Sequence, residues 1–444
     1  MPYSLRFCNL RSLVFIMEQV IAAIATPQGR GGVSVVRLSG EGALPLARKM
    51  FSKTGEFIPN TLYVGDIDCG AFRDRGMCVW FRAPKSFTGE DVVEFHCHGG
   101  VEITRGVLDR ALSLGARLAE RGEFTKRAFL NGKLSLSAAE GMADMIDAES
   151  QAQVRAGYSL YTERLTNEGK RLQSLLTTCL AGIDADLDYP EEDLQADTAA
   201  EVLQKLQEVK GALQALLKQY RAGRKIKSGV TAVFCGKPNA GKSSLFNALL
   251  GCDRSIVTEI PGTTRDTVEG AIEINGVRFN LIDTAGLREG TDVVEREGIR
   301  RAELAVKNAD LILWLKGDGE EEAFPPETPV ITVGAKSDLV KREGCDVCVS
   351  SVTGEGIGAL KELMYERGFG RESDVFVLEE RHYRAAEEAC GAVEKAEDAV
   401  KSGLPAELYA EEVHAAWVAL GAFSGETASE AVISEIFDKF CVGK

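Results

Sequence analysis

The spacing of hydrophobic residues changes several times along this chain, and each change predicts a different kind of structure. Between residues 17 and 133, short apolar or alternating runs are separated by glycine-rich turns and helical patches; three such runs are Val20–Ala25, Val33–Leu38 and Val92–Cys97. Runs of this length bounded by turns are typical of β-strands. We therefore expect a compact α+β domain over residues 17–133.

Residues 134–227 lose the β-branched runs and become rich in Ala, Leu, Glu and Gln. One apolar stripe advances by three or four positions and so shares one helix face; it consists of Val202, Leu206, Val209, Leu213, Leu216 and Leu217. The proline-containing segment Tyr189–Glu192 interrupts the pattern and predicts a turn between two long helices. Helical spacing returns over residues 371–444, as in Ala385–Val400 and Ala428–Phe440.

Between these helical segments, residues 228–370 alternate short buried strands with helices. Such alternation predicts a mostly parallel sheet, here of six strands. A helical region divided by an α/β domain indicates an insertion, so we expect segments 134–227 and 371–444 to pack together. The predicted fold class is multidomain α/β, with an N-terminal α+β domain, a long helical domain and an inserted α/β domain.

Composition narrows this picture. A chain of 444 residues is too long for a single hydrophobic core, so several domains are expected. The hydrophobic content of 45% is ordinary for a globular protein, and no apolar run is long enough to span a bilayer. The net charge of −15 argues against nucleic-acid binding through overall charge, so RNA contacts require a local basic patch or a partner. The apolar residues of segment 1–16 follow no regular spacing, whereas regular spacing begins after Met17. We therefore interpret 1–16 as an extension or a misassigned start.

The eleven cysteines are scattered, and Cys345 with Cys348 is the one close pair. A structural zinc site needs four ligands, and no second pair completes this one, so the sequence does not favour a metal there. Free thiols are typical of a reducing cytoplasm.

Residues 236–243 read Gly-Lys-Pro-Asn-Ala-Gly-Lys-Ser and follow the apolar run Val230–Cys235. The pattern G-x-x-x-x-G-K-[ST] between a predicted strand and the predicted helix Ser244–Leu250 indicates a phosphate loop. Backbone N–H groups and the helix N-terminus bind phosphate oxygens, Lys242 reaches the outer phosphates and Ser243 can ligate Mg²⁺. The alternative to a phosphate-binding loop is a purely structural strand, turn and helix. The match of these residues to the full motif argues against that alternative.

Further motifs follow in order. The segment Thr258-Glu259-Ile260-Pro261-Gly262-Thr263-Thr264-Arg265-Asp266 precedes a predicted hairpin, Ala271–Ile274 and Val277–Ile282, that turns at Asn275-Gly276. The second strand ends in Asp283-Thr284-Ala285-Gly286. An Asp at this place holds Mg²⁺, usually through water, and the Gly N–H can sense a γ-phosphate.

Two later strands, Leu311–Leu315 and Val330–Val333, lead to Ala335-Lys336-Ser337-Asp338. The Asp338 carboxylate can accept both N1–H and the exocyclic amine of guanine, a pair that adenine does not offer. The backbone of Ser351, after the strand Val347–Ser350, could meet the guanine carbonyl. Together the motifs predict a Ras-like GTPase domain.

Two departures concern this domain. Ala335 stands where the guanine motif normally has Asn, which removes a contact to the base and a tie to the phosphate loop. One such contact is worth ~1–3 kcal/mol, so we expect weaker guanine binding with specificity carried by Asp338. In addition, Gly317–Thr328 is short and contains Pro325-Pro326, so a crossover helix looks trimmed.

Hydrolysis needs a group to orient water, and Leu287 occupies the position where many small GTPases have Gln. No arginine finger is evident in the chain, although Arg265 and Arg288 lie near the switches. Asn239 and the segment Thr258–Thr264 could hold K⁺ through carbonyl oxygens. Asn239 could instead be a turn former after the preceding proline, and the residues alone favour this second interpretation over a K⁺ ligand.

Segments outside the GTPase motifs resemble the family of tRNA modification GTPases called MnmE or TrmE. They are Gly29–Val33 with Arg37, Ser86–Asp91, Arg121–Asn131 and the C-terminal Phe440–Lys444, and the similarity covers residues 17–444. Ribosome-associated GTPases share the central motifs and none of these flanking segments. The resemblance implies domains at 17–133 (tetrahydrofolate binding and dimerisation), 134–227 (helical), 228–370 (GTPase) and 371–444 (helical).

The resemblance also implies roles in the GTPase domain. It assigns Asn239, Thr258, Ile260 and Thr263 to K⁺, Ser243 and Thr264 to Mg²⁺, and Glu295 with Lys242 to catalysis. GTP binding falls to Asn239, Ala240, Gly241, Lys242, Ser243, Ser244, Thr258, Glu259, Ile260, Pro261, Gly262, Thr263, Thr264, Asp283, Thr284, Ala285, Gly286, Lys336, Asp338 and Ser351. Pattern alone would make Glu295 a solvated helix residue.

In the N-terminal domain the resemblance implies a site for 5-formyl- or 5,10-methylene-tetrahydrofolate, built from Arg37, Glu94, Lys133 and Lys444. A pterin edge suits the Glu94 carboxylate, and basic residues suit the glutamate of folate. His96 and His98 share a strand face, which could suggest a metal, but no further ligand is apparent and a structural role is favoured. Cys441 could be a reactive thiol handling the one-carbon unit or a buried structural cysteine.

Finally, the resemblance implies a cytoplasmic homodimer that binds tRNA and does not associate with membranes. It also implies a heterotetramer with the FAD-dependent protein MnmG (GidA). The complex would add an aminomethyl or carboxymethylaminomethyl group to C5 of the wobble uridine while GTP hydrolysis drives a conformational cycle. The alternative is an RNA-binding switch in ribosome assembly, which a basic module beside the GTPase domain would favour. The amine donor, glycine or ammonium, and the tRNAs modified stay open.

Overall fold

The structure is a computed structural model. It describes residues 19–188, 199–252, 270–283, 300, 302–316, 324–325, 327–340, 342–370, 379–425 and 428–444. The chain divides into two compact units, residues 1–143 with 424–444 and residues 144–423. The predicted domains divide the chain more finely and stay predictions. The extension 1–16 and the turn Tyr189–Glu192 lie outside the described residues.

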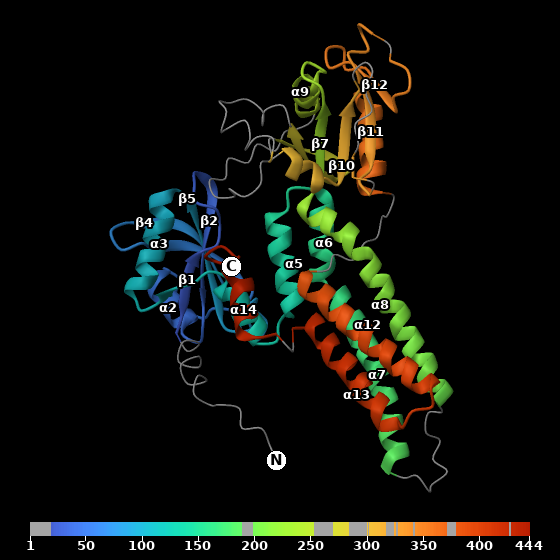
Figure 1. Cartoon of the computed structure of the whole chain (residues 1–444). Helices are drawn as coiled ribbons and strands as arrows, with labels where there is room; N and C mark the ends of the chain where they lie inside the picture. The colour runs from blue at the N-terminus through green and yellow to red at the C-terminus, as the bar shows by residue number, and fades with distance from the viewer. Residues whose placement is uncertain are drawn as a thin grey trace. The chain divides into compact units, whose positions relative to one another are not determined.

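The first unit contains a six-stranded sheet in the order β3-β4-β5-β2-β1-β6 (Figure 1). Its strands are β1 (Ile21–Ile24), β2 (Gly31–Ser39), β3 (Leu62–Asp68), β4 (Arg73–Phe81), β5 (Val92–Gly99) and β6 (Arg117–Leu118). β1 and β6 are parallel, and the other neighbours are antiparallel. The three strands predicted from the sequence are present as β1, β2 and β5.

Helices cover both faces of this sheet. α2 (Ala43–Met50) and α3 (Val101–Ser113) pack on one face and α4 (Glu123–Leu130) on the other. Two further helices, α5 (Leu136–Asp147) and α14 (Glu430–Asp438), pack against each other. The main core packs α2 and α3 against side chains such as Leu38 and Phe95. Period-two alternation sends Arg37 of β2 to the opposite face, where Phe124 of α4 packs with β1. A smaller cluster joins α14 to α5 through Leu136 and Phe437.

The second unit contains a helical bundle and an α/β domain. The helices are α6 (Gln151–Tyr161), α7 (Arg164–Asp188), α8 (Ala199–Ser228), α12 (Glu380–Lys401) and α13 (Ala406–Leu420), with a 3-10 turn at Gly421–Phe423. Helices α7, α8, α12 and α13 share one core, although the chain between α8 and α12 builds the α/β domain. The predicted stripe of α8 faces this core, with Leu217 at its edge. No helix in the described part of the chain is both long and apolar enough to cross a membrane.

The α/β domain has a six-stranded sheet in the order β12-β11-β10-β7-β9-β8. Its elements are β7 (Val230–Gly236), α9 (Lys242–Cys252), β8 (Gly270–Ile274), β9 (Val277–Asp283), β10 (Leu311–Leu315), β11 (Val330–Ala335), β12 (Val347–Val349), α11 (Ile357–Met364) and a π-helical turn at Tyr365–Phe369. All neighbours are parallel except the β8–β9 hairpin. Asn275 and Gly276 both have positive φ, as a tight hairpin turn requires. The predicted fold class is confirmed.

Candidate functional site

The phosphate loop connects the carboxyl end of β7 to α9, at the sheet edge where open α/β folds bind ligands. Gly236 has φ +140°, and a Cβ there would lie 2.6 Å from the carbonyl oxygen of Leu315. Only glycine therefore fits this close approach of β7 to β10. Asn239 has φ +63° and is exposed, so it forms the left-handed turn while its amide group stays accessible.

Lys242 opens α9 and is almost fully buried, with 6% of its surface exposed. Its ammonium group donates hydrogen bonds to the carbonyl oxygens of Gly236 and Lys237, at 2.8 Å each. The positively charged ammonium group therefore lies within the loop, beside the N-terminus of α9. A buried ammonium and a helix N-terminus both favour a bound phosphate.

Ser243 and Asp283 meet at the same edge. Asp283 ends β9, lies opposite Phe234 of β7 and is 4% exposed. The Ser243 hydroxyl donates to Asp283 Oδ2 at 2.7 Å. Hydroxyl and carboxylate oxygens are the hard ligands that Mg²⁺ prefers, so the described donor set fits this ion.

The segment predicted to bind guanine, Ala335–Asp338, begins at the last residue of β11. Ala335 is buried, and the Cβ position at Gly241 is 3.5 Å from its methyl group. Lys336 has φ +60° and its ammonium group donates to the carbonyl oxygen of Asn239 at 3.1 Å. We expected Ala335 to remove the tie between this segment and the phosphate loop; the next residue, Lys336, supplies one from its own side chain.

Backbone bonds hold this segment to the neighbouring strand. Ser337 N donates to the carbonyl oxygen of Val349 at 3.0 Å, and Asp338 follows in a turn. The buried Ser350 hydroxyl accepts from the N–H groups of Val352 and Thr353. This arrangement shapes the loop that contains Ser351, so Asp338 and Ser351 both follow the carboxyl ends of adjacent strands.

Several predicted site residues lie outside the described residues: Thr258, Glu259, Ile260, Pro261, Gly262, Thr263, Thr264, Thr284, Ala285, Gly286, Leu287 and Glu295. The same holds for most of the trimmed crossover, residues 317–323 and 326. Their assignments stay predictions.

The first unit brings the predicted folate residues Arg37 and Glu94 together. They are register partners on β2 and β5, and Arg37 Nε donates to Glu94 Oε1 at 2.8 Å. The guanidinium carbon of Arg37 lies 5.6 Å from the ring centre of Phe87 and 5.7 Å from that of Phe124. His96 Nε2 lies 3.2 Å from Glu94 Oε2. The sheet face therefore carries a half-buried ion pair flanked by aromatic rings.

The C-terminal tail runs beside the same part of the sheet. Val442 forms a β-bridge with Arg121, and a Cβ at Gly443 would lie 2.2 Å from the carbonyl oxygen of Ile24. Ile24 pairs with the β2 residue that precedes Arg37. The tail that carries Lys444 therefore passes close to the strand of Arg37. Cys441 is exposed, so the reading of a buried structural cysteine is wrong.

Lys133 contacts the loop that carries Phe87, the ring beside Arg37. Its ammonium group donates to the carbonyl oxygen of Pro84 at 3.0 Å, and its Cγ is 3.3 Å from the Cβ position at Gly89. His98 pairs instead with Asp74, Nδ1 to Oδ1 at 2.7 Å. In the described ranges no group of three or more His, Cys, Asp or Glu is placed to hold a metal ion.

The sequence pattern did not predict a buried ionic network in this unit. Arg127 is 2% exposed and bonds Glu90 at 3.0 Å and Glu123 at 3.0 Å. Burial opposes the lowered pKa of Glu123, whereas hydrogen bonds from Arg117, the backbone and Arg127 produce it. Phe87 and Phe124 were missed as well. All these residues except Arg117 lie in Ser86–Asp91 or Arg121–Asn131, the segments that carry the resemblance, which was the available signal.

Comparisons with known proteins match both units. A family model described as GTP-binding protein TrmE N-terminus matches residues 20–133, and one described as MnmE helical domain matches residues 136–441. The tRNA modification GTPase MnmE of Acetivibrio thermocellus is 37% identical over 456 residues, covering 96% of this chain and 99% of the relative. That of Neisseria meningitidis serogroup B is 42% identical over 445 residues, covering 96% and 98%. Among solved structures, the G domain of the T. maritima FeoB iron transporter is 30% identical, covering 31% of this chain and 98% of that domain, with a TM-score of 0.23.

Proposed function

Because the chain belongs to the MnmE family of tRNA modification GTPases, we propose that it is a K⁺-activated enzyme acting on the wobble uridine of certain tRNAs. It hydrolyses GTP to GDP and phosphate in the course of tRNA modification. With an FAD-dependent partner of the MnmG (GidA) type, it adds an aminomethyl or carboxymethylaminomethyl group to C5 of that uridine. GTP turnover drives a conformational cycle and is separate from the modification chemistry.

The observation that carries the proposal is the Ser243–Asp283 hydrogen bond of 2.7 Å beside the buried Lys242 ammonium. It supports a Mg²⁺–GTP site at the edge where β7 and β9 end. Lys242 and the loop N–H groups neutralise phosphate charge, while Ser243 and Thr264 ligate Mg²⁺ and Asp283 acts through water. Ala240, Gly241 and Ser244 complete the phosphate-binding loop.

For guanine recognition, Asp338 accepts the two N–H groups of the base and Ser351 offers a backbone donor. Lys336 supports the proposal, since its bond to the Asn239 carbonyl oxygen couples the base and phosphate sides of the site. Specificity thus rests on a carboxylate that pairs with guanine and leaves adenine without a partner.

Hydrolysis needs positive charge and an oriented water. When bound, K⁺ supplies charge of the kind that an arginine finger provides, a contribution of ~10³–10⁵ in rate in GTPases generally. Asn239, accessible at the surface of the loop, holds it together with Thr258, Ile260 and Thr263. Glu295 orients the attacking water because Leu287 lacks a polar group. The GTPase domains of two subunits meet across these segments in the active homodimer.

In the first unit we assign a tetrahydrofolate derivative, the one-carbon source, to Arg37, Glu94, Lys133 and the tail residue Lys444. The aromatic rings beside the Arg37–Glu94 pair support a flat ligand such as a pterin. Glu94 offers a carboxylate to the pterin N–H groups, and the basic residues bind the glutamate carboxylates. The exposed Cys441 thiol is available to the one-carbon unit.

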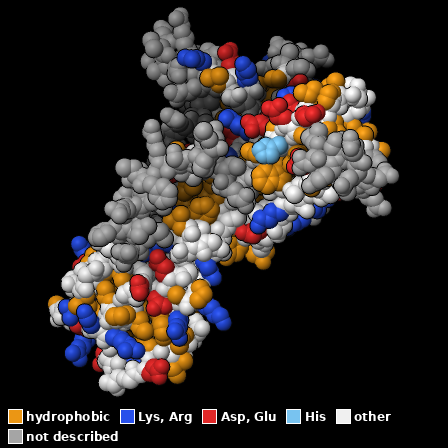
Figure 2. Space-filling model, turned by 90° about the horizontal axis from the view of Figure 1, so that it is seen from below, with side chains coloured by type: hydrophobic (Ala, Val, Ile, Leu, Met, Phe, Trp, Pro, Cys, Tyr) orange, Lys and Arg blue, Asp and Glu red, His pale blue; other side chains and the backbone are white. Residues whose placement is uncertain are grey.

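The tRNA contacts of the complex fall largely to the partner in this proposal. On the face drawn in Figure 2, acidic, basic and apolar side chains of the described residues are interspersed, without one broad basic area. Together with the net charge of −15, this mixture supports a division of labour within a cytoplasmic heterotetramer.

GTP turnover by the full-length protein in KCl and in NaCl of equal ionic strength tests the proposal. We expect turnover to be at least about tenfold faster in KCl, with similar nucleotide affinity in both salts. Equal rates would contradict K⁺ activation. Glu295→Ala should keep nucleotide affinity and lose about 10²-fold or more in turnover, whereas Glu303→Ala, exposed in the helical stretch before β10, should match the wild type.

A further inference from the structure

Two thiols of the α/β domain lie beside the proposed guanine segment and have no part in the proposed function. Cys345 is partly exposed and Cys348 is exposed, whereas six other described cysteines are buried. Cys345 precedes β12 and Cys348 is its central residue. Accessible thiols three positions apart are a recurrent arrangement for reversible oxidation.

The two sulfur atoms gather over one glycine. Gly334 of β11 is the register partner of Cys348, and the Cβ position at Gly334 is 3.0 Å from Cys348 Sγ and 3.2 Å from Cys345 Sγ. These distances limit the separation of the sulfurs to about 6 Å, a gap that rotation about the Cα–Cβ bonds reduces toward disulfide length. A larger residue at position 334 would occupy the space that the thiols share.

We propose that Cys345 and Cys348 form a reversible disulfide that lowers the affinity of the domain for guanine nucleotides. The oxidant is a small-molecule disulfide such as oxidised glutathione. The exposed Cys348 thiolate attacks one of its sulfurs and releases one small thiol. The Cys345 thiolate then attacks the Cys348 sulfur, which closes the Cys345–Cys348 bond and releases the second small thiol. The protein loses two protons and two electrons, and the small disulfide gains them.

The order of attack follows from exposure. Burial raises the pKa of the Cys345 thiol, and the neighbouring Cys348 adds to this effect, while Lys316 and Arg342 oppose it. Because a raised pKa reduces the thiolate fraction, the accessible Cys348 is the better first nucleophile. Cys345 then acts within the same loop, where its effective concentration is high.

The segment between the cysteines is held to β11, where Val347 pairs with Val333 and Asp346 N donates to the carbonyl oxygen of Thr332 at 2.9 Å. Asp346 accepts hydrogen bonds from the backbone N–H of Thr332 at 2.7 Å and from the Arg367 guanidinium at 2.5 Å. The Cys348 thiol in turn donates to the carbonyl oxygen of Arg342 at 3.5 Å, a bond that oxidation removes. Closing the sulfur–sulfur gap therefore pulls Cys348 against the pairing of β12 with β11.

β12 holds the guanine segment. Val349, the residue after Cys348, accepts the hydrogen bond from Ser337 N, which lies between Lys336 and Asp338. A shift of β12 weakens this bond and displaces Asp338 from the base. This part of the inference rests on the proposed guanine site, whereas disulfide formation itself does not.

The test uses the full-length protein in buffers of reduced and oxidised glutathione. Alkylation followed by peptide mass spectrometry reports the thiols, and fluorescent GDP titration reports affinity in the same samples. We expect a Cys345–Cys348 disulfide that dithiothreitol reverses, with a loss of affinity of about two- to tenfold, equivalent to one weakened hydrogen bond. A glutathione adduct on Cys348 without the internal disulfide would overturn the inference, as would a disulfide with unchanged affinity.

Cys345→Ser and Cys348→Ser separate this inference from the proposed function. Each variant should bind GDP as the reduced wild type does and should keep that affinity in oxidised glutathione. An equal redox response in either variant would assign the effect to other thiols and overturn the proposal. Failure of the reduced wild type to bind GDP would instead count against the proposed guanine site, since the disulfide is detected by mass alone.

Discussion

The Lys336 ammonium group donates a hydrogen bond to the backbone carbonyl oxygen of Asn239 at 3.1 Å. The bond links the segment proposed to read guanine to the turn of the phosphate loop. Its effect is to fix the distance between the two ends of the nucleotide site before a ligand binds. The buried Ala335 has only a methyl group and offers no side-chain hydrogen bond of its own.

Lys336→Met should therefore weaken binding of both GDP and GTP. The variant keeps the apolar stem and removes the charged donor, so we expect a loss of about 1–2 kcal/mol, or roughly five- to thirtyfold in Kd. Titration with fluorescent GDP measures it. Lys307→Met, exposed before β10, is the matched control, and equal affinity in both variants would show that the bond to Asn239 has no role in binding.

Ser243→Ala should raise the Mg²⁺ concentration needed for GTP turnover. The hydroxyl that bonds Asp283 is one of the proposed Mg²⁺ ligands, and its loss leaves water to replace it. We expect the half-maximal Mg²⁺ concentration to rise about tenfold, as for a charge-assisted contact of ~1.4 kcal/mol. Asn247→Ala, exposed further along α9, should behave as the wild type; an unchanged Mg²⁺ requirement in Ser243→Ala would remove Ser243 from the site.

Stability of the second unit should depend on pH through Asp144. Lys227 lies 3.0 Å from Asp144 and also pairs with Glu379. Burial, together with the charge of Glu379, raises the pKa of Asp144 from 3.8 to about 6, while Lys227 opposes the rise. Between those values the folded state binds a proton that the unfolded state does not. The free energy of unfolding therefore falls as pH rises through about 6.

Asp144→Asn should remove this slope, because the amide stays neutral. Urea unfolding gives the free energy of unfolding of the variant minus that of the wild type. This difference should be larger at pH 7.5 than at pH 4.5 by about 1–3 kcal/mol. Asp147→Asn, an exposed residue of the same helix, is the control. If both variants keep the wild-type pH dependence, Asp144 is not the titrating group.

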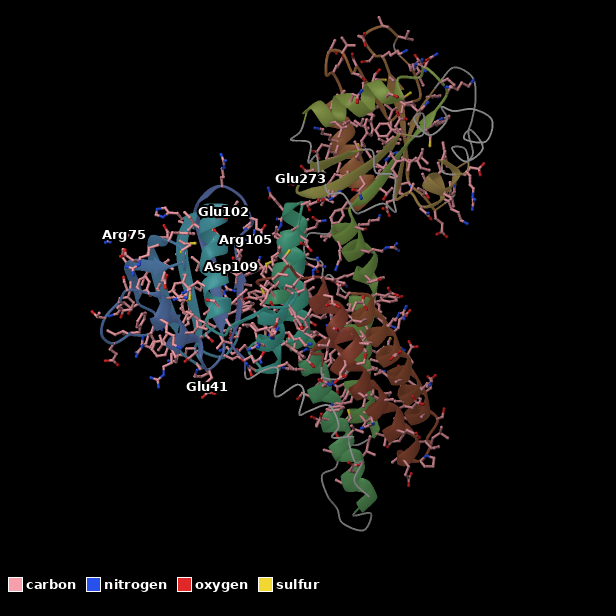
Figure 3. The ribbon with its side chains drawn as sticks, turned by 90° about the vertical axis from the view of Figure 1, so that its left-hand side faces the viewer. Glu41, Arg75, Glu102, Arg105, Asp109 and Glu273 are labelled. Atoms are coloured by element: carbon pink, nitrogen blue, oxygen red, sulfur yellow. The ribbon has the colours of Figure 1, made fainter. Side chains whose placement is uncertain are left out.

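Arg37→Ala should weaken the binding of 5-formyl-tetrahydrofolate measured by calorimetry. Removal of the guanidinium leaves the half-buried Glu94 carboxylate without its ion-pair partner and opens the space between Phe87 and Phe124. We expect a loss of more than about tenfold in affinity, in line with a partly buried charge pair. Arg75→Ala is the control, since the Arg75 side chain is 74% exposed and projects outward from β4 (Figure 3). Wild-type affinity in Arg37→Ala would rule out the proposed folate site.

The sequence predicted the GTPase fold well because its elements are set locally. Asn275-Gly276 specifies a tight turn by itself, and the apolar run Val230–Cys235 can only be a buried strand next to a phosphate loop. The α8 stripe was equally clear, since one face of a long helix must be covered. These features need no knowledge of distant residues.

The rest depends on contacts between distant segments. Lys336 and Asn239 are separated by 97 positions, and nothing in either motif shows that their segments are joined by a hydrogen bond. Likewise, the apolar positions of α14 could pack against any core, and only the fold assigns Phe437 to the cluster around Leu136. Pattern alone also left the exposure of Cys441 open.

The central claim is that GTP turnover at this phosphate loop supports modification of the wobble uridine. Nucleoside analysis of tRNA tests it most directly, in a strain that lacks the gene and carries either the wild-type chain or Lys242→Ala. The account predicts that the wild type restores the C5-modified uridine and that Lys242→Ala, which lacks the buried ammonium proposed to bind phosphate, leaves the uridine unmodified. Equal levels of the modified nucleoside in the deletion strain and its parent would contradict it.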